Sequence, residues 1–508
     1  MRLRKIEWGV LSFLIFVALT ARLLPGHRLV DDSYITFRYA RNIVNGNGFV
    51  YNEGERVLGT TTPLYTLLLA AISILKGTSD FPILAIGTNA LAGAISVILL
   101  YFLTRLLIGH WLPATGAALV WAVAPYSVTF AIGGMETDVT IALLLAAALA
   151  YVYRRPYLLT GASALAVLAR PDTGILLLLL WVGLVLSEQR IPWREGLLGL
   201  ALLAPWLIYS TLTFGSPLPA SIGAKSLTYR VPPTAALIRF IQHYSTPFFG
   251  DALFGAFWRL GGFVTYLALS SIGALRAVRR SPRVWPVFAY PYAYFAIFAL
   301  ANPLLFRWYL SPPLPFYFLT IFAGIWFLAL DLGEVLSDVD AKTVAQGATA
   351  ICAVVALLLT LNAWELHPDH GPDRPAPEMA WFKLELFYKQ AAEIVLEQAG
   401  PDDGLCAGDI GMLGYRTGLR VIDTVGLVTP ASTQFYPADP AIYVTNYAIP
   451  ADLVLSLDPD FIVILEVYGR LGLLPDPRFQ AQYELVERLD ADIYGSRGML
   501  IFSRAESE

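Results

Sequence analysis

The stretch DDSYITFRYARNIVNGNGFVYNEGERVLGTTTPLYTLLLA, residues 31–70, decides how this chain is interpreted. It begins with two adjacent aspartates and ends in an apolar run that starts at Pro63. One apolar segment, Trp8–Leu24, precedes it, and another, Ile83–Leu107, follows it. A charged loop held between two such segments predicts polar groups at the edge of a lipid bilayer.

The composition of the whole chain agrees with that prediction. Of 508 residues, 56% are hydrophobic and only 15% are charged. So much apolar sequence exceeds what one aqueous core holds, so we expect lipid to surround most of it. The net charge of -4 gives no reason to expect nucleic acid as a partner. Eleven segments are apolar enough to span or nearly span: Trp8–Leu24, Ile83–Leu107, Ala114–Ala131, Val139–Tyr153, Tyr157–Ala169, Thr173–Leu186, Leu197–Leu212, Gly261–Leu275, Trp285–Ala301, Tyr309–Leu330 and Val344–Leu361.

The run Pro63–Leu75 is a further apolar segment, but it is short for a span. If it does not cross and the N-terminus is cytoplasmic, the basic cluster at 276–283 falls on the inner side, as the positive-inside rule requires. We therefore expect a juxtamembrane helix over 63–75, at the outer interface. The protein is then a multi-pass plasma-membrane protein, and we expect its first segment to be an uncleaved anchor, with a secretory signal as the alternative.

The sequence changes character near residue 363. Residues 1–363 form the predicted membrane domain, which includes the outer loop 25–62, and residues 364–508 are more polar. Strand-like runs at Phe461–Leu465 and Met499–Phe502, with helical periodicity over Glu378–Gln398, predict a soluble α/β domain. By the same topology this domain is extracytoplasmic, and it follows a Pro-rich connector, His367–Pro377.

Asp31 and Asp32 are the first candidates for chemistry. Two adjacent carboxylates near lipid repel each other and sit in a lowered dielectric, which raises the pKa of at least one and suits it to general-base work. The same pair is also typical of a helix N-terminus, so the pair alone leaves both interpretations open. On a helix beginning near Ser33, Tyr34, Arg38 and Arg41 share one face. Such a face suits a membrane-anchored phosphate, although arginines at an interface also contact lipid headgroups.

Further polar residues gather in loops predicted to lie outside. Glu136 and Asp172 each occupy an expected membrane–water edge, where helix capping and function are equally good interpretations. Arg170 precedes Asp172 in the turn Arg170-Pro171-Asp172. Lys225 and Arg307 add cations. Arg307 lies among apolar and aromatic residues, so it requires an anionic partner from protein, lipid or substrate.

Taken together, these motifs resemble the membrane-embedded C-fold (GT-C) glycosyltransferases, most closely the group around the actinobacterial terminal arabinofuranosyltransferase. The resemblance rests on the 31–70 block and covers nearly the whole chain in order. It continues through GGMETD (133–138), ARPD (169–172), GSPLPASIGAK (215–225), RWYLSPPLP (307–315), GDIGMLGY (408–415) and IDTVGL (422–427). One departure is Pro219-Ala220-Ser221 before Lys225, where the family loop often has an amide or acid and a threonine.

The resemblance implies about 11 transmembrane helices, an acidic first outer loop, an outer C-terminal domain and a polyprenyl-phosphate sugar as donor. The expected reaction is inverting transfer of a glycosyl residue, arabinofuranosyl in the best-known relatives, to a cell-envelope glycan, lipid or protein. Asp31 is then the expected base, with Asp32 orienting it or binding substrate. Arg38, Arg41, Lys225 and Arg307 are expected to hold the donor phosphate. Tyr34, Glu136, Arg170 and Asp172 are further candidates for the substrate site.

Two other classes of protein fit parts of the sequence. A lipid or sugar transporter, or a flippase, would place ionisable groups near the bilayer midplane and show related halves. A non-catalytic scaffold that binds glycans would not need the acids and arginines of residues 31–41. No cofactor is required, while adjacent carboxylates are compatible with a divalent cation. The sugar, the acceptor and any metal stay open from the sequence.

Overall fold

The computed structural model describes residues 3–336, 340–364 and 380–505, and these fold into two compact units. The first unit comprises Met1–Gly26, Ile86–Ala204 and Pro233–Leu366. The second comprises His27–Ala85, Pro205–Pro232 and His367–Glu508. The first outer loop and residues 205–232 thus fold together with the C-terminal residues, whereas the sequence suggested a single boundary after residue 363. The expected connector His367–Pro377 lies outside the described residues.

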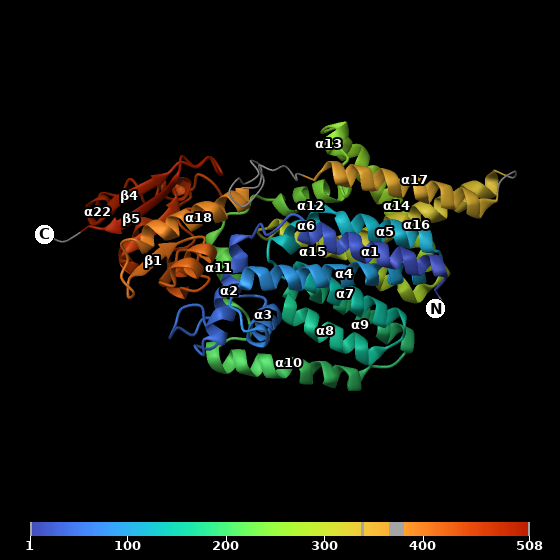
Figure 1. Cartoon of the computed structure of the whole chain (residues 1–508), viewed down its shortest axis with the longest axis horizontal. Helices are drawn as coiled ribbons and strands as arrows, with labels where there is room; N and C mark the ends of the chain where they lie inside the picture. Colours follow the sequence, from blue (N-terminus) through green and yellow to red (C-terminus); the bar gives the residue numbers. More distant parts are fainter. Residues whose placement is uncertain (1–2, 337–339, 365–379, 506–508) are drawn as a thin grey trace. The chain divides into compact units, whose positions relative to one another are not determined.

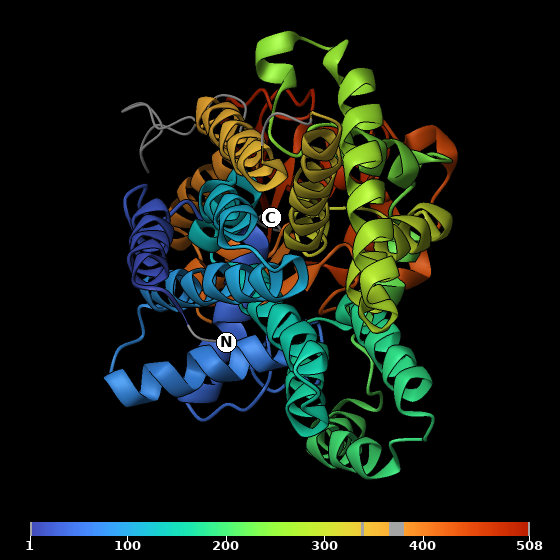
Figure 2. The same cartoon turned by 90° about the vertical axis from the view of Figure 1, so that its right-hand side faces the viewer.

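The first unit is helical throughout its described part, and Figures 1 and 2 show its helices from two directions. Two long helices, α4 (Phe81–Ile108) and α10 (Trp193–Phe214), are divided between the units. The others are α1 (Lys5–Leu23), α5 (Trp111–Val123), α6 (Pro125–Ile132), α7 (Thr137–Val152), α8 (Pro156–Ala169), α9 (Gly174–Glu188), α12 (Ala235–Ser245), α13 (Asp251–Phe254), α14 (Trp258–Arg280), α15 (Trp285–Ala301), α16 (Leu314–Val335) and α17 (Ala341–Asn362), with the short 3-10 helices η1 (Pro171–Thr173), η2 (Pro282–Val284) and η3 (Arg307–Leu310).

Within the described residues, eight helical segments are long and apolar enough to cross a membrane, and the bent pair α5 and α6 would make nine. Helices α7 and α8 are apolar but shorter, with 16 and 14 residues. Every apolar segment expected from the sequence is helical, although Ala114–Ala131 is divided between α5 and α6 and Tyr309–Leu330 between η3 and α16. The protein is a multi-pass membrane protein. The number of crossings and the side on which each loop emerges stay predictions.

Small residues let the helices of the first unit approach closely. A Cβ on Gly273 of α14 would lie 2.1 Å from the carbonyl oxygen of Thr320 in α16. In the same way, a Cβ on Gly324 of α16 would lie 1.9 Å from the carbonyl oxygen of Leu269. Glycines on both helices therefore bring the two backbones into contact, which is how apolar helices pack where hydrophobic burial alone does not drive association.

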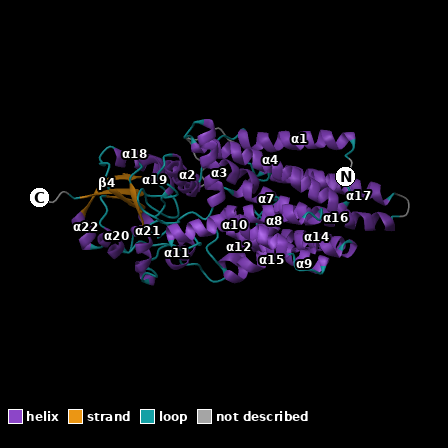
Figure 3. Cartoon of the chain, turned by 90° about the horizontal axis from the view of Figure 1, so that it is seen from below, coloured by secondary structure: helices purple, strands orange, loops and turns teal. Residues whose placement is uncertain are grey.

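The second unit contains a five-stranded mixed sheet with helices around it (Figure 3). The strand order is β2-β1-β3-β5-β4; β1 pairs in parallel with β2 and β3, whereas β5 pairs antiparallel with β3 and β4. The expected α/β domain is confirmed. The strands are β1 (Gly404–Ala407), β2 (Arg420–Asp423), β3 (Phe461–Leu465), β4 (Tyr483–Leu489) and β5 (Met499–Arg504). The helices are α2 (Asp31–Val44), α3 (Pro63–Lys76), α11 (Ala220–Thr228), α18 (Ala380–Leu396), α19 (Gly411–Thr417), α20 (Ala451–Leu457), α21 (Glu466–Gly469) and α22 (Pro477–Gln482), with the 3-10 helices η5 (Pro430–Phe435) and η6 (Pro440–Ile442).

Helix α3 is the expected short apolar helix after the first loop. It begins with Pro63, whose fixed φ suits the first turn, and ends at Gly77, whose φ is +63°. Tyr65 and Leu69 are buried, whereas Leu75 on another face is 85% exposed. The helix is therefore confirmed, and its exposed apolar side fits an interfacial position, which stays a prediction.

Candidate functional site

The aspartate pair opens helix α2 in the second unit, and Asp31 is clamped there by backbone groups. Its Oδ2 accepts a hydrogen bond from the N–H of Gly411 (2.8 Å), and its Oδ1 accepts one from the N–H of Met412 (2.7 Å). Both donors belong to the first turn of α19, whose amides have no acceptor within their own helix. Asp31 is only 8% exposed. Burial, followed by the charge of Asp409, raises the pKa of Asp31 well above its usual range, and the two N–H bonds oppose that shift.

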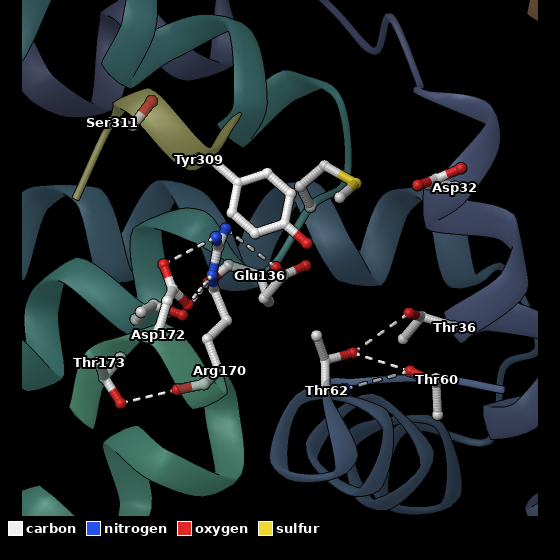
Figure 4. Close-up of polar contacts among 12 residues, drawn as sticks. Asp32, Thr36, Thr60, Thr62, Glu136, Arg170, Asp172, Thr173, Tyr309 and Ser311 are labelled. Carbon is white, nitrogen blue, oxygen red and sulfur yellow. Dashed lines mark hydrogen bonds and ion pairs between the residues drawn. The ribbon is translucent and has the colours of Figure 1, made fainter. Parts of the chain in front are cut away.

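Asp32 presents the more accessible carboxylate of the pair. Its side chain is 31% exposed, and its Oδ2 lies 3.8 Å from Nζ of Lys225 in α11. At that distance the two charges attract each other without a tight hydrogen bond. One turn further along α2, Thr36 lies 3.4 Å from the Thr62 hydroxyl, as Figure 4 shows. The second unit therefore places the Lys225 ammonium group beside the Asp32 carboxylate, with threonine hydroxyls one turn further along α2.

The sequence analysis missed a third carboxylate, Asp409. The Tyr388 hydroxyl donates a hydrogen bond to Asp409 Oδ2 (2.6 Å). Burial raises the pKa of Asp409 to about 6, the Tyr388 hydrogen bond lowers it, and the charge of Asp32 raises it further. Asp409 follows the carboxyl end of the parallel strand β1, the position where α/β sheets most often bind ligands. We call Asp31, Asp32, Lys225, Tyr388 and Asp409 the aspartate group.

The face formed by Tyr34, Arg38 and Arg41 exists as expected, but it packs against residues of α18 and α19. Tyr34 donates a hydrogen bond to Glu385 Oε1 (2.8 Å). Arg38 is 3% exposed and donates to the carbonyl oxygens of Tyr51, Gly414 and Leu419 and to Asn52 Oδ1. These acceptors occupy the guanidinium, so Arg38 stabilises the fold here, and its contact with a phosphate stays a prediction.

Arg41 and Tyr34 also contact other residues of the second unit. Arg41 donates to the carbonyl oxygen of Tyr415 (2.8 Å), and its guanidinium lies 4.6 Å from the centre of that ring. Tyr34 is 5% exposed. Of the three, only Arg41 keeps a partly exposed side chain, so Arg41 is the most accessible phosphate candidate on this face.

A second polar group, in the first unit, joins the motifs GGMETD and ARPD. Arg170 contacts Asp172 through two hydrogen bonds (2.9 and 3.0 Å) and Glu136 through a third (3.4 Å), as Figure 4 shows. The ring centre of Tyr309 lies 4.7 Å from the guanidinium carbon, and the Tyr294 hydroxyl donates to Asp172 Oδ2 (2.8 Å). Arg170 is 3% exposed. We call these five residues the Arg170 group.

The Arg170 group carries two carboxylates for one guanidinium, so its net charge is negative. A phosphate would meet Glu136 and Asp172 as well as Arg170, which disfavours phosphate binding there. The arrangement instead suits hydroxyl groups, which donate to carboxylates. Neither Glu136 nor Asp172 has its expected alternative role as a side-chain cap.

Arg307 is an exposed cation of the first unit at the start of η3. Its neighbours Phe306 and Trp308 stack with ring centres 4.7 Å apart. The exposure leaves its guanidinium accessible to an anion, so Arg307 stays a candidate for contact with a phosphate or a lipid headgroup.

No set of three or more His, Cys, Asp or Glu side chains among the described residues has the geometry of a metal site. The aspartate group consists of three carboxylates, one ammonium and one phenol.

The fold is similar to those of several solved membrane proteins. The described fold superimposes on ArnT from Cupriavidus metallidurans bound to undecaprenyl phosphate, with a TM-score of 0.59, 13% identity and 99% of each chain covered. It also matches the archaeal oligosaccharyltransferase AglB from Archaeoglobus fulgidus, in complex with an inhibitory peptide and a dolichol-phosphate, with a TM-score of 0.57, 12% identity, 99% of this chain and 74% of that chain.

Similarity in sequence is more limited. The terminal beta-(1->2)-arabinofuranosyltransferase of Mycobacterium tuberculosis is 30% identical over 122 residues, which are 23% of this chain. The match spans 20% of the length of that curated relative. Residues 379–502 match a family described as a domain of unknown function (DUF8728). The expectation from the sequence is thus confirmed at the level of architecture: the chain has the fold of GT-C glycosyltransferases.

Proposed function

We propose that this chain is a glycosyltransferase that moves a sugar from a polyprenyl-phosphate donor to an acceptor hydroxyl at the outer face of the membrane. The observation that carries the proposal is the Asp32–Lys225 pair, in which a partly exposed carboxylate lies 3.8 Å from a partly exposed ammonium. Glycosyl transfer from a phosphate donor needs both groups: a base for the acceptor and a cation for the leaving phosphate. The fold shared with proteins solved with undecaprenyl phosphate and dolichol-phosphate supports such a donor.

The sequence alone suggested Asp31 as the base, whereas the geometry favours Asp32. Both oxygens of Asp31 accept backbone N–H bonds, and the residue is buried. A base must reach the hydroxyl whose proton it removes, and Asp32 is the accessible member of the pair. We therefore assign the base role to Asp32 and a supporting role to Asp31.

The reaction then follows as a single displacement. The acceptor hydroxyl gives its proton to the Asp32 carboxylate while its oxygen bonds to the anomeric carbon of the donor. The bond between that carbon and the phosphate oxygen breaks, and its electron pair leaves with the polyprenyl phosphate. Lys225 offsets the charge on the departing phosphate. Attack opposite to the leaving group inverts the anomeric centre.

The sugar to test first is arabinofuranose. The sequence match to an arabinofuranosyltransferase covers only part of either chain, so it selects a starting substrate and leaves the acceptor class, a glycan, lipid or protein of the cell envelope, to experiment.

The test uses the purified full-length protein in lipid nanodiscs with labelled polyprenyl-phosphate sugars and a glycan acceptor. Asp32→Asn should lower the turnover number by a factor of roughly 100 to 10,000, the usual contribution of a general base, while donor affinity changes little. Asp402→Asn, which removes an exposed carboxylate of the same unit, is the matched control and should behave as wild type. Lys225→Met should weaken donor binding as well as turnover.

Three outcomes would contradict the proposal in different ways. Near wild-type turnover by Asp32→Asn together with inactive Asp31→Asn would return the base role to Asp31. Movement of labelled lipid across the bilayer without covalent transfer would indicate a transporter or flippase. Glycan binding with neither transfer nor movement would indicate a scaffold.

A further inference from the structure

The C-terminal domain contacts the aspartate pair through one short segment, Gly408-Asp409-Ile410-Gly411-Met412 (residues 408–412). This segment connects strand β1 to helix α19. Its last two residues supply the N–H groups that bind Asp31, at 2.8 and 2.7 Å. The same segment carries Asp409, the third carboxylate of the aspartate group.

The fit between the segment and Asp31 is tight enough to require glycine. A Cβ on Gly411 would lie 1.7 Å from the carbonyl oxygen of Asp31 and 2.8 Å from its Oδ2. The first of these atoms is backbone, so it cannot rotate away. Any side chain at position 411 must therefore separate the segment from Asp31 and break both hydrogen bonds.

The position of the segment in the sheet is also one that α/β folds use for binding and chemistry. From β1 the sheet continues to β2 on one side and to β3 on the other, so the strand order reverses at β1. Loops at the carboxyl ends of strands at such a reversal form the usual functional site of open α/β sheets. Here that loop is residues 408–412, and it is directed at Asp31.

Several charged and titratable groups act on Asp409. Tyr388 of α18 donates a hydrogen bond to it, and its charge acts on Asp31. The charges of Asp32 and Lys225 also act on Asp409, and the charge of Asp409 in turn acts on Tyr229 and Tyr468. Asp409 therefore belongs to the charged groups that surround the aspartate pair.

From these contacts we infer that the C-terminal domain is part of the catalytic centre, in which residues 408–412 hold Asp31 in place beside Asp32. This inference rests on the proposed function and adds positioning residues to it. Gly411 and Met412 act through Asp31, and neither needs to touch the substrate. The domain therefore does more than cover the site or hold the acceptor.

The first experiment tests the hydrogen bonds from the Gly411 and Met412 N–H groups to Asp31, without any substrate. The N–H groups of Gly411 and Met412 start a helix, so their protection against hydrogen exchange depends on the Asp31 carboxylate. In the full-length protein, Asp31→Ala should speed exchange in the peptide that contains residues 411–412 by ~10-fold or more, the effect of losing a charged hydrogen bond. Asp32→Ala is the matched control and should leave that exchange unchanged. Equal exchange rates at residues 411–412 in Asp31→Ala and Asp32→Ala would contradict the role of residues 408–412 in holding Asp31.

The second experiment measures how the contact between residues 408–412 and Asp31 affects turnover. Gly411→Ala should lower the turnover number on the order of 100-fold, as a displacement of about 1 Å at a reacting group does. Gly400→Ala is the control, because a Cβ there meets only atoms at 3.7 Å or beyond. Wild-type turnover by Gly411→Ala would overturn the positioning role.

A comparison of these two experiments separates the hydrogen bonds to Asp31 from the proposed function. If the wild-type protein transfers no sugar while Asp31→Ala still speeds exchange at residues 411–412, the proposed function is wrong, but the hydrogen bonds from this segment to Asp31 are confirmed.

Discussion

Replacing Arg22 with methionine should destabilise the first unit strongly, because it leaves a buried aspartate without its counter-charge. Arg22 of α1 and Asp138 of α7 are both fully buried, and Arg22 Nε lies 2.8 Å from Asp138 Oδ2. Arg22 also donates to the carbonyl oxygens of Ala18 and Ala122 and to the Ser127 hydroxyl. Removing one partner of such a pair typically costs about 3–5 kcal/mol, and we expect that range for Arg22→Met.

The double variant Arg22→Met/Asp138→Asn should be no less stable than Arg22→Met alone, and it should recover up to about 1 kcal/mol of that loss. Neither residue then carries a charge, and only the hydrogen bonds are missing. We expect Asp138→Asn alone to cost about 2 kcal/mol, because Arg22 keeps its three neutral acceptors. The interaction energy from the double-mutant cycle should then be about 2–3 kcal/mol.

Unfolding of the full-length protein in mixed micelles by increasing the fraction of dodecyl sulfate, followed by tryptophan fluorescence, gives these differences. Arg279→Met removes an exposed arginine from the end of α14 and should stay within ~0.5 kcal/mol of wild type. If Arg22→Met were as stable as Arg279→Met, or if the losses of the two single variants simply added, the buried pair would not be the source of the stability.

Three further predictions follow from other contacts. Gly93→Ala should lose stability as Arg22→Met does in the same titration, because its Cβ would lie 2.1 Å from Arg22 Nε. Burial raises the pKa of Asp423 to about 6 in the folded protein, against 3.8 normally, so the folded state binds more protons between these values and stability falls as pH rises from about 4 to 6. Asp423→Asn should reduce that slope by up to ~1.4 kcal/mol per pH unit, which melting temperatures at pH 4.5 and 6.5 would detect. Arg307→Ala should weaken donor binding about tenfold without changing the melting temperature, whereas Arg38→Ala should lower the melting temperature, since the Arg38 guanidinium donates to four oxygens.

The helical part of the fold was predictable because its signal is local. Each expected apolar segment is helical, and even the short run after Pro63 ends where a glycine adopts a positive φ. The strand Phe461–Leu465 was predicted with the ends that the structure gives it. Continuous apolar runs bounded by turn residues carry this information in a few neighbouring positions.

The partners of the site residues were not predictable, because they come from distant parts of the chain. Asp31 is bound by amides 380 and 381 residues away, and Arg38 donates to Gly414, which is 376 residues away. Periodicity correctly placed Tyr34, Arg38 and Arg41 on one face, but it could not show what that face meets. Asp409 was missed although a signal existed: it follows a strand that proved to be parallel, at the edge where such sheets bind ligands.

The way each charge is held separates those that maintain the fold from those available for chemistry. Arg38 and Arg170 are buried, and each guanidinium is bound to several oxygens, so displacing either one would leave several acceptors unsatisfied. Lys225 instead faces Asp32 across 3.8 Å with both side chains partly exposed, so an incoming phosphate can take the ammonium at little cost. A lysine suits that exchange better than an arginine, because it is a single mobile charge and makes no fixed fork with a carboxylate. The same pair therefore places the cation proposed for the donor phosphate beside the carboxylate proposed to receive the acceptor's proton.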